Sequence, residues 1–151
     1  MKKLLKLSTL LLTLVLLFNF AACSSFGKVE KALKGAGYAK IEIEENDVYN
    51  EAKDDERVTN VHLFSNKDSL SGIELAKLTI VVVIEFRATD ELVDYFKESD
   101  TLKGLVKDIK EDGTADEIYN ALKTAGLVHE NCIVAPLGLD VINVLKVISE
   151  L

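Results

Sequence analysis

Apolar residues recur with helical spacing directly after position 25. They stand at i, i+3, i+7 and i+10, which is one face of an α-helix: Phe26, Val29, Leu33 and Ala36. Ser25 is a favourable N-cap residue, and Gly37 is a residue that commonly ends a helix. The pattern therefore predicts a helix over 26–36 with one apolar stripe.

Two segments that follow alternate between apolar and polar residues. Positions 38–44 place Ile41 and Ile43 on one face, and positions 57–64 repeat the alternation. Such a period of two is typical of half-exposed strands. In the second strand the expected inward residues are Val61 and Leu63, and the expected outward residues are Asn60 and His62.

Two uninterrupted runs of apolar residues predict two further strands. Positions 73–86 include the most β-branched stretch of the chain, from Leu78 to Ile84. Because a strand that is apolar on both faces must be covered on both faces, this one is predicted to be central in its sheet. Positions 131–136 predict a short strand that ends at the chain's single proline.

The remaining apolar segments have helical spacing. One helix is predicted to be capped by Thr89 or Asp90, and the next to be capped by Ser99 or Asp100 and to stop near Gly113. Two more helices are predicted over 115–125 and 139–151. The first follows a capping box of Thr114 and Glu117 and ends at Gly126. The second is so apolar that we expect it to be largely buried, either in the domain or against a partner.

The order of these elements predicts the fold class. A helix, three strands, three helices, a strand and a final helix suggest an α+β domain. We expect a single small domain over 26–151, built as an antiparallel or mixed sheet of about four strands with helices packed on it.

The first 25 residues have a different pattern. Lys2, Lys3 and Lys6 form a basic head, and an apolar core follows at positions 10–18. That core is about half as long as the roughly 20 residues that span a bilayer. A basic head, a short apolar middle and small residues before a cleavage point are typical of a secretory signal peptide. Here the small residues are Ala21 and Ala22.

The next residue is Cys23, and Phe20-Ala21-Ala22-Cys23 resembles the lipobox of a bacterial lipoprotein precursor. Phe20 departs from the usual leucine of that motif. The resemblance covers residues 1–25 and implies nothing about the domain behind them. It implies that 1–22 are a cleaved signal peptide, that Cys23 receives a diacylglyceryl group, and that 23–25 are a short lipidated tether.

The resemblance also implies a location in the cell. Two acyl chains hold a protein stably at a membrane, so the domain would lie on the extracytoplasmic face of the cell membrane. In a cell with two membranes it could lie on the outer membrane instead. The alternatives are an ordinary secretory signal that happens to contain a cysteine, and an uncleaved membrane helix.

The net charge limits the classes of partner that we expect. Of 151 residues, 129 remain after 1–22 are removed. Fifteen of the 18 basic residues stay with all 25 acidic ones, which gives a net charge of −10. Nucleic acid is therefore excluded as an expected partner, and repulsion from anionic lipid is expected. The domain keeps one further thiol, Cys132, and so has no internal disulfide.

Two parts of the sequence contain residue types found in catalytic or metal-binding sites. His129 and Cys132 are three residues apart, and a nucleophilic thiol would need a histidine to take its proton. We expect His129 in a turn and Cys132 buried at the start of a strand. The second candidate is segment 44–56, which begins with Glu44, ends with Glu56 and contains seven acids. It is a loop or a short helix, and clustered carboxylates suit hard cations.

Neither candidate decides the function. The Asp/Asn spacing of 44–56 does not match a calcium-binding loop, and an acidic run is usually a solvated surface. We therefore expect no catalytic, cofactor-binding or metal-binding residues. The preferred hypothesis is a non-enzymatic binding or interaction module of the cell envelope, with an envelope protein as partner. The alternatives are a small envelope enzyme that uses Cys132 and His129, and a cation-binding domain.

Overall fold

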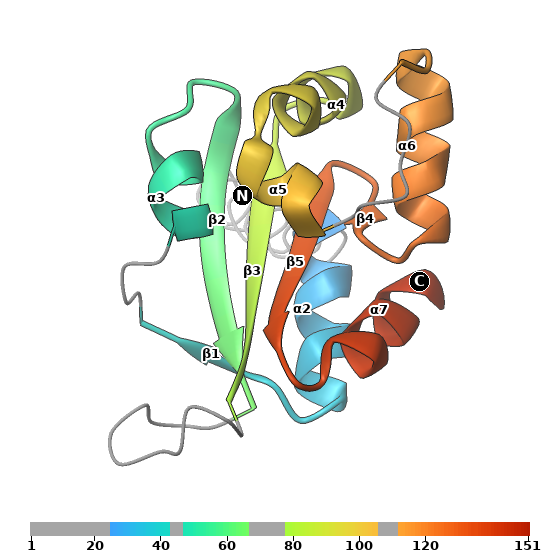
Figure 1. Cartoon of the computed structure of the whole chain (residues 1–151). Coiled ribbons are helices and arrows are strands. Elements are labelled where there is room, and N and C mark those ends of the chain that lie inside the picture. Colours follow the sequence, from blue (N-terminus) through green and yellow to red (C-terminus); the bar gives the residue numbers. More distant parts are fainter. Residues whose placement is uncertain (1–24, 43–46, 67–77, 106–111) are drawn as a thin grey trace, which may run out of the picture.

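The protein has three layers, with one sheet between two layers of helices (Figure 1). The computed structural model describes residues 25–42, 47–66, 78–105 and 112–151. The helices are α2 Ser25–Gly35, α3 Asp47–Lys53, α4 Thr89–Glu98, α5 Asp100–Leu105, α6 Ala115–Thr124 and α7 Val141–Ser149. The strands are β1 Ala39–Ile41, β2 Val58–Ser65, β3 Thr79–Phe86, β4 Val128–His129 and β5 Cys132–Gly138.

The sheet is antiparallel throughout, and its strand order is β1-β2-β3-β5-β4. This confirms the α+β class and the central position predicted for the β-branched strand, β3. Over the described residues the sheet has five strands, where about four were expected. The additional strand, β4, has only two residues, which is too short to show a period of two.

Alternate residues of β3 pack into two different hydrophobic clusters. Val82 and Ile84 join the cluster under α3–α6, whereas Val81 and Val83 join the cluster under α2 and α7. The helices contribute their apolar stripes to these clusters: Ala52, Leu92, Phe96, Ile118 and Leu122 on one side, and Val29, Leu33, Val144 and Ile148 on the other. Because both faces are covered, nearly every residue of β3 is buried.

Local sequence signals set the helix ends. The capping box predicted for α6 is present, since Thr114 Oγ1 accepts from the Glu117 amide and the Glu117 carboxylate accepts from the Thr114 amide. Gly126 follows with φ +74°, and the amides of Gly126 and Leu127 donate to the carbonyls of Lys123 and Leu122. This is the Schellman pattern, which glycine at positive φ permits.

The predicted caps of α4 and α5 had different outcomes. Ala88 is the N-cap of α4 and makes no side-chain bond, so the prediction of Thr89 or Asp90 was wrong. Asp90 instead accepts a bond from the amide of Glu91. Ser99 Oγ accepts from the Leu102 amide at the start of α5, as predicted for a cap. The expected end of that helix, at 106–111, lies outside the described residues.

Strand β5 continues two residues beyond Pro136, so the prediction that the proline ends it was wrong. The Val134 amide donates to the Leu127 carbonyl on the side of β4. Position 136 points to the same side, where β4 has already ended. Proline is therefore tolerated because its missing N–H faces no partner strand.

Helix α7 is less buried than predicted. Val144 and Ile148 pack against the sheet, but Ile142 is 83% exposed, and Leu139, just before the helix, is 77% exposed. A helix on the outside of a layer buries one stripe only, so the other apolar residues remain at the surface.

The acidic segment forms α3, which buries Val48 and Ala52. Positions 43–46 lie outside the described residues.

Candidate functional site

Cys132 and His129 face each other across the β4–β5 hairpin. His129 is in strand β4, not in the turn where it was expected, and its Cα is paired with that of Cys132. The turn consists of Glu130 and Asn131, with Glu130 at φ +51°. Cys132 is fully buried, as expected, under the α2–α7 layer.

This environment suppresses thiolate chemistry. Burial, together with the charges of Glu85 and Glu130, raises the pKa of the Cys132 thiol to about 12. Burial also lowers the pKa of His129, whose Nε2 has no hydrogen-bond partner among the described residues. A neutral thiol without access to solvent is a poor nucleophile. The pair is therefore a packed part of the core and not an activated Cys–His couple.

His62 is not the surface residue that was predicted. Its side chain is 14% exposed, and its Nε2 lies 2.8 Å from Glu85 Oε2. The ring stacks on Phe26 of α2, with ring centroids 3.7 Å apart. The alternation of β2 suggested an outward side chain, and the sequence did not reveal that α2 covers that face. Its contacts hold α2 against the sheet.

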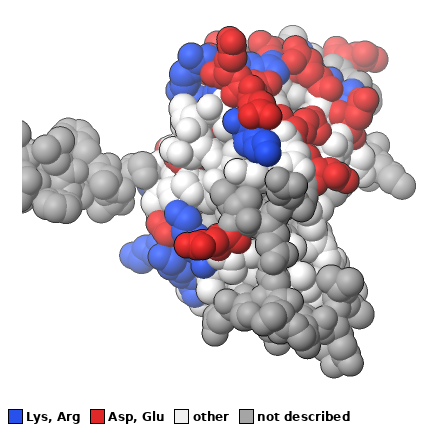
Figure 2. Space-filling view, turned by 90° about the vertical axis from the view of Figure 1, so that its left-hand side faces the viewer, with Lys and Arg blue, Asp and Glu red and all other residues white. Residues whose placement is uncertain are grey.

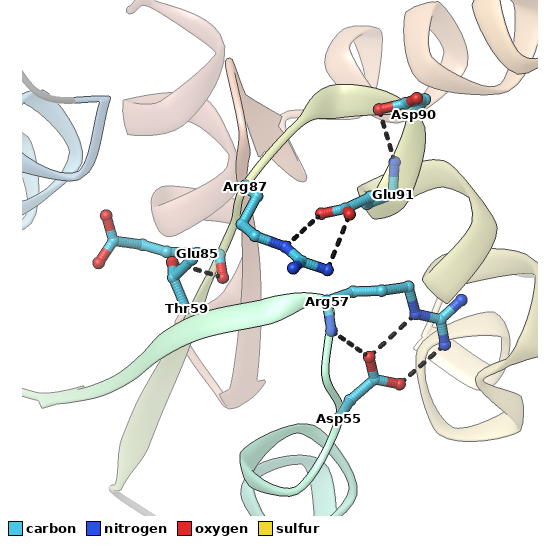
Figure 3. Close-up of polar contacts among 7 residues, drawn as sticks. All are labelled: Asp55, Arg57, Thr59, Glu85, Arg87, Asp90 and Glu91. Carbon is cyan, nitrogen blue, oxygen red and sulfur yellow. Dashed lines mark hydrogen bonds and ion pairs between the residues drawn. The ribbon is translucent and has the colours of Figure 1, made fainter.

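One acid of the segment, Asp55, forms an ion pair with Arg57, just before β2 begins. Arg57 donates to both carboxylate oxygens of Asp55 and also binds Glu98 of α4. Arg87 pairs with Glu91, as Figure 3 shows. The hydrogen bonds from Arg57 lower the pKa of Asp55. Both arginines thus have carboxylate partners and join the strand ends to the helices.

No metal-binding site is assembled among the described residues. Within them, no group of three or more His, Cys, Asp or Glu side chains is gathered as metal ligands would be. Asp55, one of the acids of 44–56, is bound to Arg57. Glu44 and Glu45 lie outside the described residues, so the cation hypothesis stays a prediction for that part.

The helix layers differ in charge. Helices α2 and α7 together hold four lysines and one glutamate, while Asp140 and Glu150 cap α7 and Glu130 pairs with Lys28, so this layer is close to neutral. Helices α3–α6 hold nine acidic residues and four lysines. Asp and Glu dominate the upper part of the face in Figure 2, and a group of Lys and Arg side chains lies at its lower left beside acidic ones. Net charge alone did not reveal this segregation, although the spacing of Lys28, Lys31 and Lys34 on one helix was a readable signal.

The α2–α7 layer also carries exposed apolar residues. Leu139 lies two residues before α7, and Ile142 is the second residue of the helix. Tyr38, which follows α2, donates a hydrogen bond from its hydroxyl to the carboxylate of Asp140. Burial and this bond raise the pKa of Tyr38 to about 12. The C-terminal end of α2 and the start of α7 are therefore held together, and Leu139 and Ile142 lie beside that junction.

The predicted lipidation residue, Cys23, lies outside the described residues, as do positions 1–22. The first described residue is Ser25, at the start of α2. Among the described residues, no helix is both long and apolar enough to cross a bilayer.

Comparison with protein-family models gives no match for this chain, and neither curated proteins nor solved structures give a significant one.

Proposed function

We propose that the chain is a lipid-anchored extracytoplasmic protein whose domain is a non-enzymatic binding or interaction module. The observation that carries the anchor is Cys23, which follows Ala21 and Ala22 directly after the apolar core of a signal-like segment. A thioether-linked diacylglyceryl group on this residue would hold the domain at the membrane.

The core supports removal of the leader. Among the described residues, both hydrophobic clusters are built between Val29 and Ile148, apart from partly buried Phe26. Cleavage before Cys23 would remove none of these side chains. The domain would then begin two residues after the lipidated cysteine, so it would sit directly at the membrane surface.

The interaction role is supported by what the surface presents. The thiol of Cys132 is buried and protonated, whereas Leu139 and Ile142 are exposed apolar side chains. Contiguous exposed apolar patches rimmed by polar residues are typical of binding surfaces, and Leu139 and Ile142 are three positions apart in the sequence. The domain thus presents exposed side chains that a partner can contact, whereas its buried thiol is not activated.

Mass spectrometry of the membrane fraction tests the anchor. We expect an N-terminal peptide that begins at Cys23, carries two or three acyl chains and lacks residues 1–22. Cys23→Ala should abolish acylation and processing, while Cys132→Ala, the matched control, should leave both unchanged. An unmodified Cys23 in the mature protein would refute the proposal.

A further inference from the structure

We propose that Glu130 is a two-position carboxylate, which holds the first turn of α2 at neutral pH and moves to His129 when acid protonates that imidazole. This exchange would detach the turn of the β4–β5 hairpin from α2 and remove the carboxylate from Lys28. The inference goes beyond the proposed function and does not depend on the anchor, because it uses only residues of the folded domain.

The first argument is the geometry around Glu130. Its Oε1 lies 2.7 Å from Lys28 Nζ and 3.6 Å from His129 Nε2. The side chain of Ser25 donates a hydrogen bond to the same carboxylate. A movement of about 1 Å would bring Oε1 within the range of a charged hydrogen bond to His129. One carboxylate thus lies between the first turn of α2 and a second, competing donor.

The second argument is the environment of His129. Its side chain is 9% exposed, and its Nε2 has no hydrogen-bond partner among the described residues. Burial lowers its pKa, and the charges of Lys28 and Lys123 act in the same direction against that of Glu130. A buried imidazolium needs a charged partner, whereas the half-exposed ammonium of Lys28 can be hydrated. Glu130 is therefore expected to leave Lys28 for His129 as the pH falls.

The lowered pKa of His129 fixes the direction of the effect. The contact with α2 favours neutral His129, so it is fully stable above about pH 6.5, the ordinary pKa of histidine. Its stability falls as the pH drops below that value. Glu130 stays ionised over this range, because the bonds from Lys28 and Ser25 lower its pKa.

The other groups around His129 do not titrate in this range. Cys132 is opposite it in β5, and the hydroxyl of Tyr119 donates to the Glu130 carbonyl. The pKa values of both groups are raised, so both stay protonated. Helix α7 also packs near β4, and the residues it buries are Val144 and Ile148, which carry no charge.

The chain's second histidine provides a contrast on the same helix. His62 Nε2 already lies 2.8 Å from Glu85 Oε2, and the ring stacks on Phe26. Lys40 Nζ lies 5.4 Å from the centre of the Phe26 ring. Protonation of His62 adds charge to an existing pair, so acid does not loosen this contact. Helix α2 therefore stays on the sheet through Phe26 while its contact with Glu130 is exchanged.

A pH titration followed by NMR tests the exchange. The full chain as purified, in detergent micelles, is titrated from about pH 8 to about pH 5, the range in which histidine changes charge. The amide resonances of Ser25 and Lys28 should shift with the same midpoint as the imidazole of His129. Exchange of the amides of 29–31, corrected for its intrinsic pH dependence, should rise about threefold, since an exposed ion pair contributes little. A Lys28 resonance that does not shift down to about pH 5 would overturn the inference.

Three variants assign the response. His129→Gln removes the titrating group and should make Ser25 and Lys28 insensitive to pH. Glu130→Gln, at a half-exposed position that tolerates substitution, should also suppress the response, because an amide cannot form an ion pair with the imidazolium. His62→Gln is the matched control and should keep it. A Lys28 shift that persists in His129→Gln, or one that disappears only in His62→Gln, contradicts the assignment to His129.

Discussion

At the scale of single residues, burial decides which groups have accessible chemistry. Cys132 has a histidine opposite it in the hairpin, which in an open cleft would be a reason to consider catalysis. Here the thiol is fully buried and its pKa rises to about 12. Proximity of two reactive residue types is therefore not sufficient, because the thiolate form is disfavoured by its surroundings.

Thiol labelling checks this directly. We expect Cys132 to resist maleimide at neutral pH in the folded protein and to react rapidly once denaturant unfolds the chain. Ser149→Cys provides the control, because position 149 is exposed at the end of α7. The new thiol should react within the folded state. Fast modification of Cys132 in folded protein would revive the hypothesis of a thiol enzyme.

The pair of Asp55 and Arg57 makes stability depend on pH. Because Arg57 lowers the pKa of Asp55 in the folded protein, the pair stabilises the fold above the unfolded-state pKa of about 3.9. The contribution is lost as pH falls through the folded-state pKa. Asp55→Asn should therefore lower the free energy of unfolding by about 1–2 kcal/mol at pH 7.

Urea unfolding across the acidic range measures this effect. The difference between Asp55→Asn and the parent protein should shrink as the pH is lowered from neutral to about 3. Asp54→Asn is the matched control, since the neighbouring Asp54 is exposed, and it should change stability little at any pH. A constant difference for Asp55→Asn would show that charge is not its contribution.

At the scale of elements, glycine positions determine where a helix can stop and what can pack against its end. Gly126 ends α6 at φ +74°, and a Cβ there would lie 2.2 Å from the carbonyl oxygen of Leu145 in α7. The glycine therefore permits both the turn and the close approach of α7. Gly35, the last residue of α2, has nothing within 4 Å of such a Cβ.

Alanine substitution separates these two cases. Gly126→Ala should destabilise the protein by more than about 1–2 kcal/mol, because the backbone conformation is unfavourable for alanine and α7 must move. Gly35→Ala should be neutral or slightly stabilising, since alanine favours the helix. Thermal unfolding followed by circular dichroism compares them. A similar melting temperature for both variants would contradict the close packing of α7 on Gly126.

The elements also show how far the sequence predicts this fold. Periodicity correctly predicted α2, β3 and α6, because each has a long apolar pattern with a recognisable end. It missed β4, whose two residues carry no period. Pattern alone also misplaced His62, because whether a face of the sheet is covered depends on where α2 packs, a long-range contact.

The distribution of charge and of exposed apolar residues was less predictable than the fold. The spacing of the α2 lysines is visible in the sequence, but their relation to the acidic helices is a property of the three layers. Similarly, α7 was expected to be largely buried because its mean composition is apolar. Its exposed Ile142 follows from the geometry of a helix that packs on one side only. Charge segregation and exposed apolar residues thus require the tertiary arrangement.

At the scale of the whole molecule, one sheet supports two hydrophobic clusters. The two clusters share strands β2, β3 and β5, each of which contributes residues to both. Loss of packing on one face therefore removes the support of the other. We therefore expect α2 and α7 to keep their places only while the layer on the opposite face is also folded.

Matched core substitutions test this coupling. Ile118→Ala acts on the cluster under α3–α6 and Ile148→Ala on the cluster under α2 and α7, and both residues are buried. Each substitution should cost about 2–4 kcal/mol. Because the two clusters share one sheet, each variant should still unfold in one transition, with hydrogen exchange accelerated in the helices of both layers. If Ile148→Ala instead releases α2 and α7 while the amides of α4 and α6 stay protected, the α2–α7 layer is an independent unit that can leave the sheet, and the shared strands do not couple the two clusters.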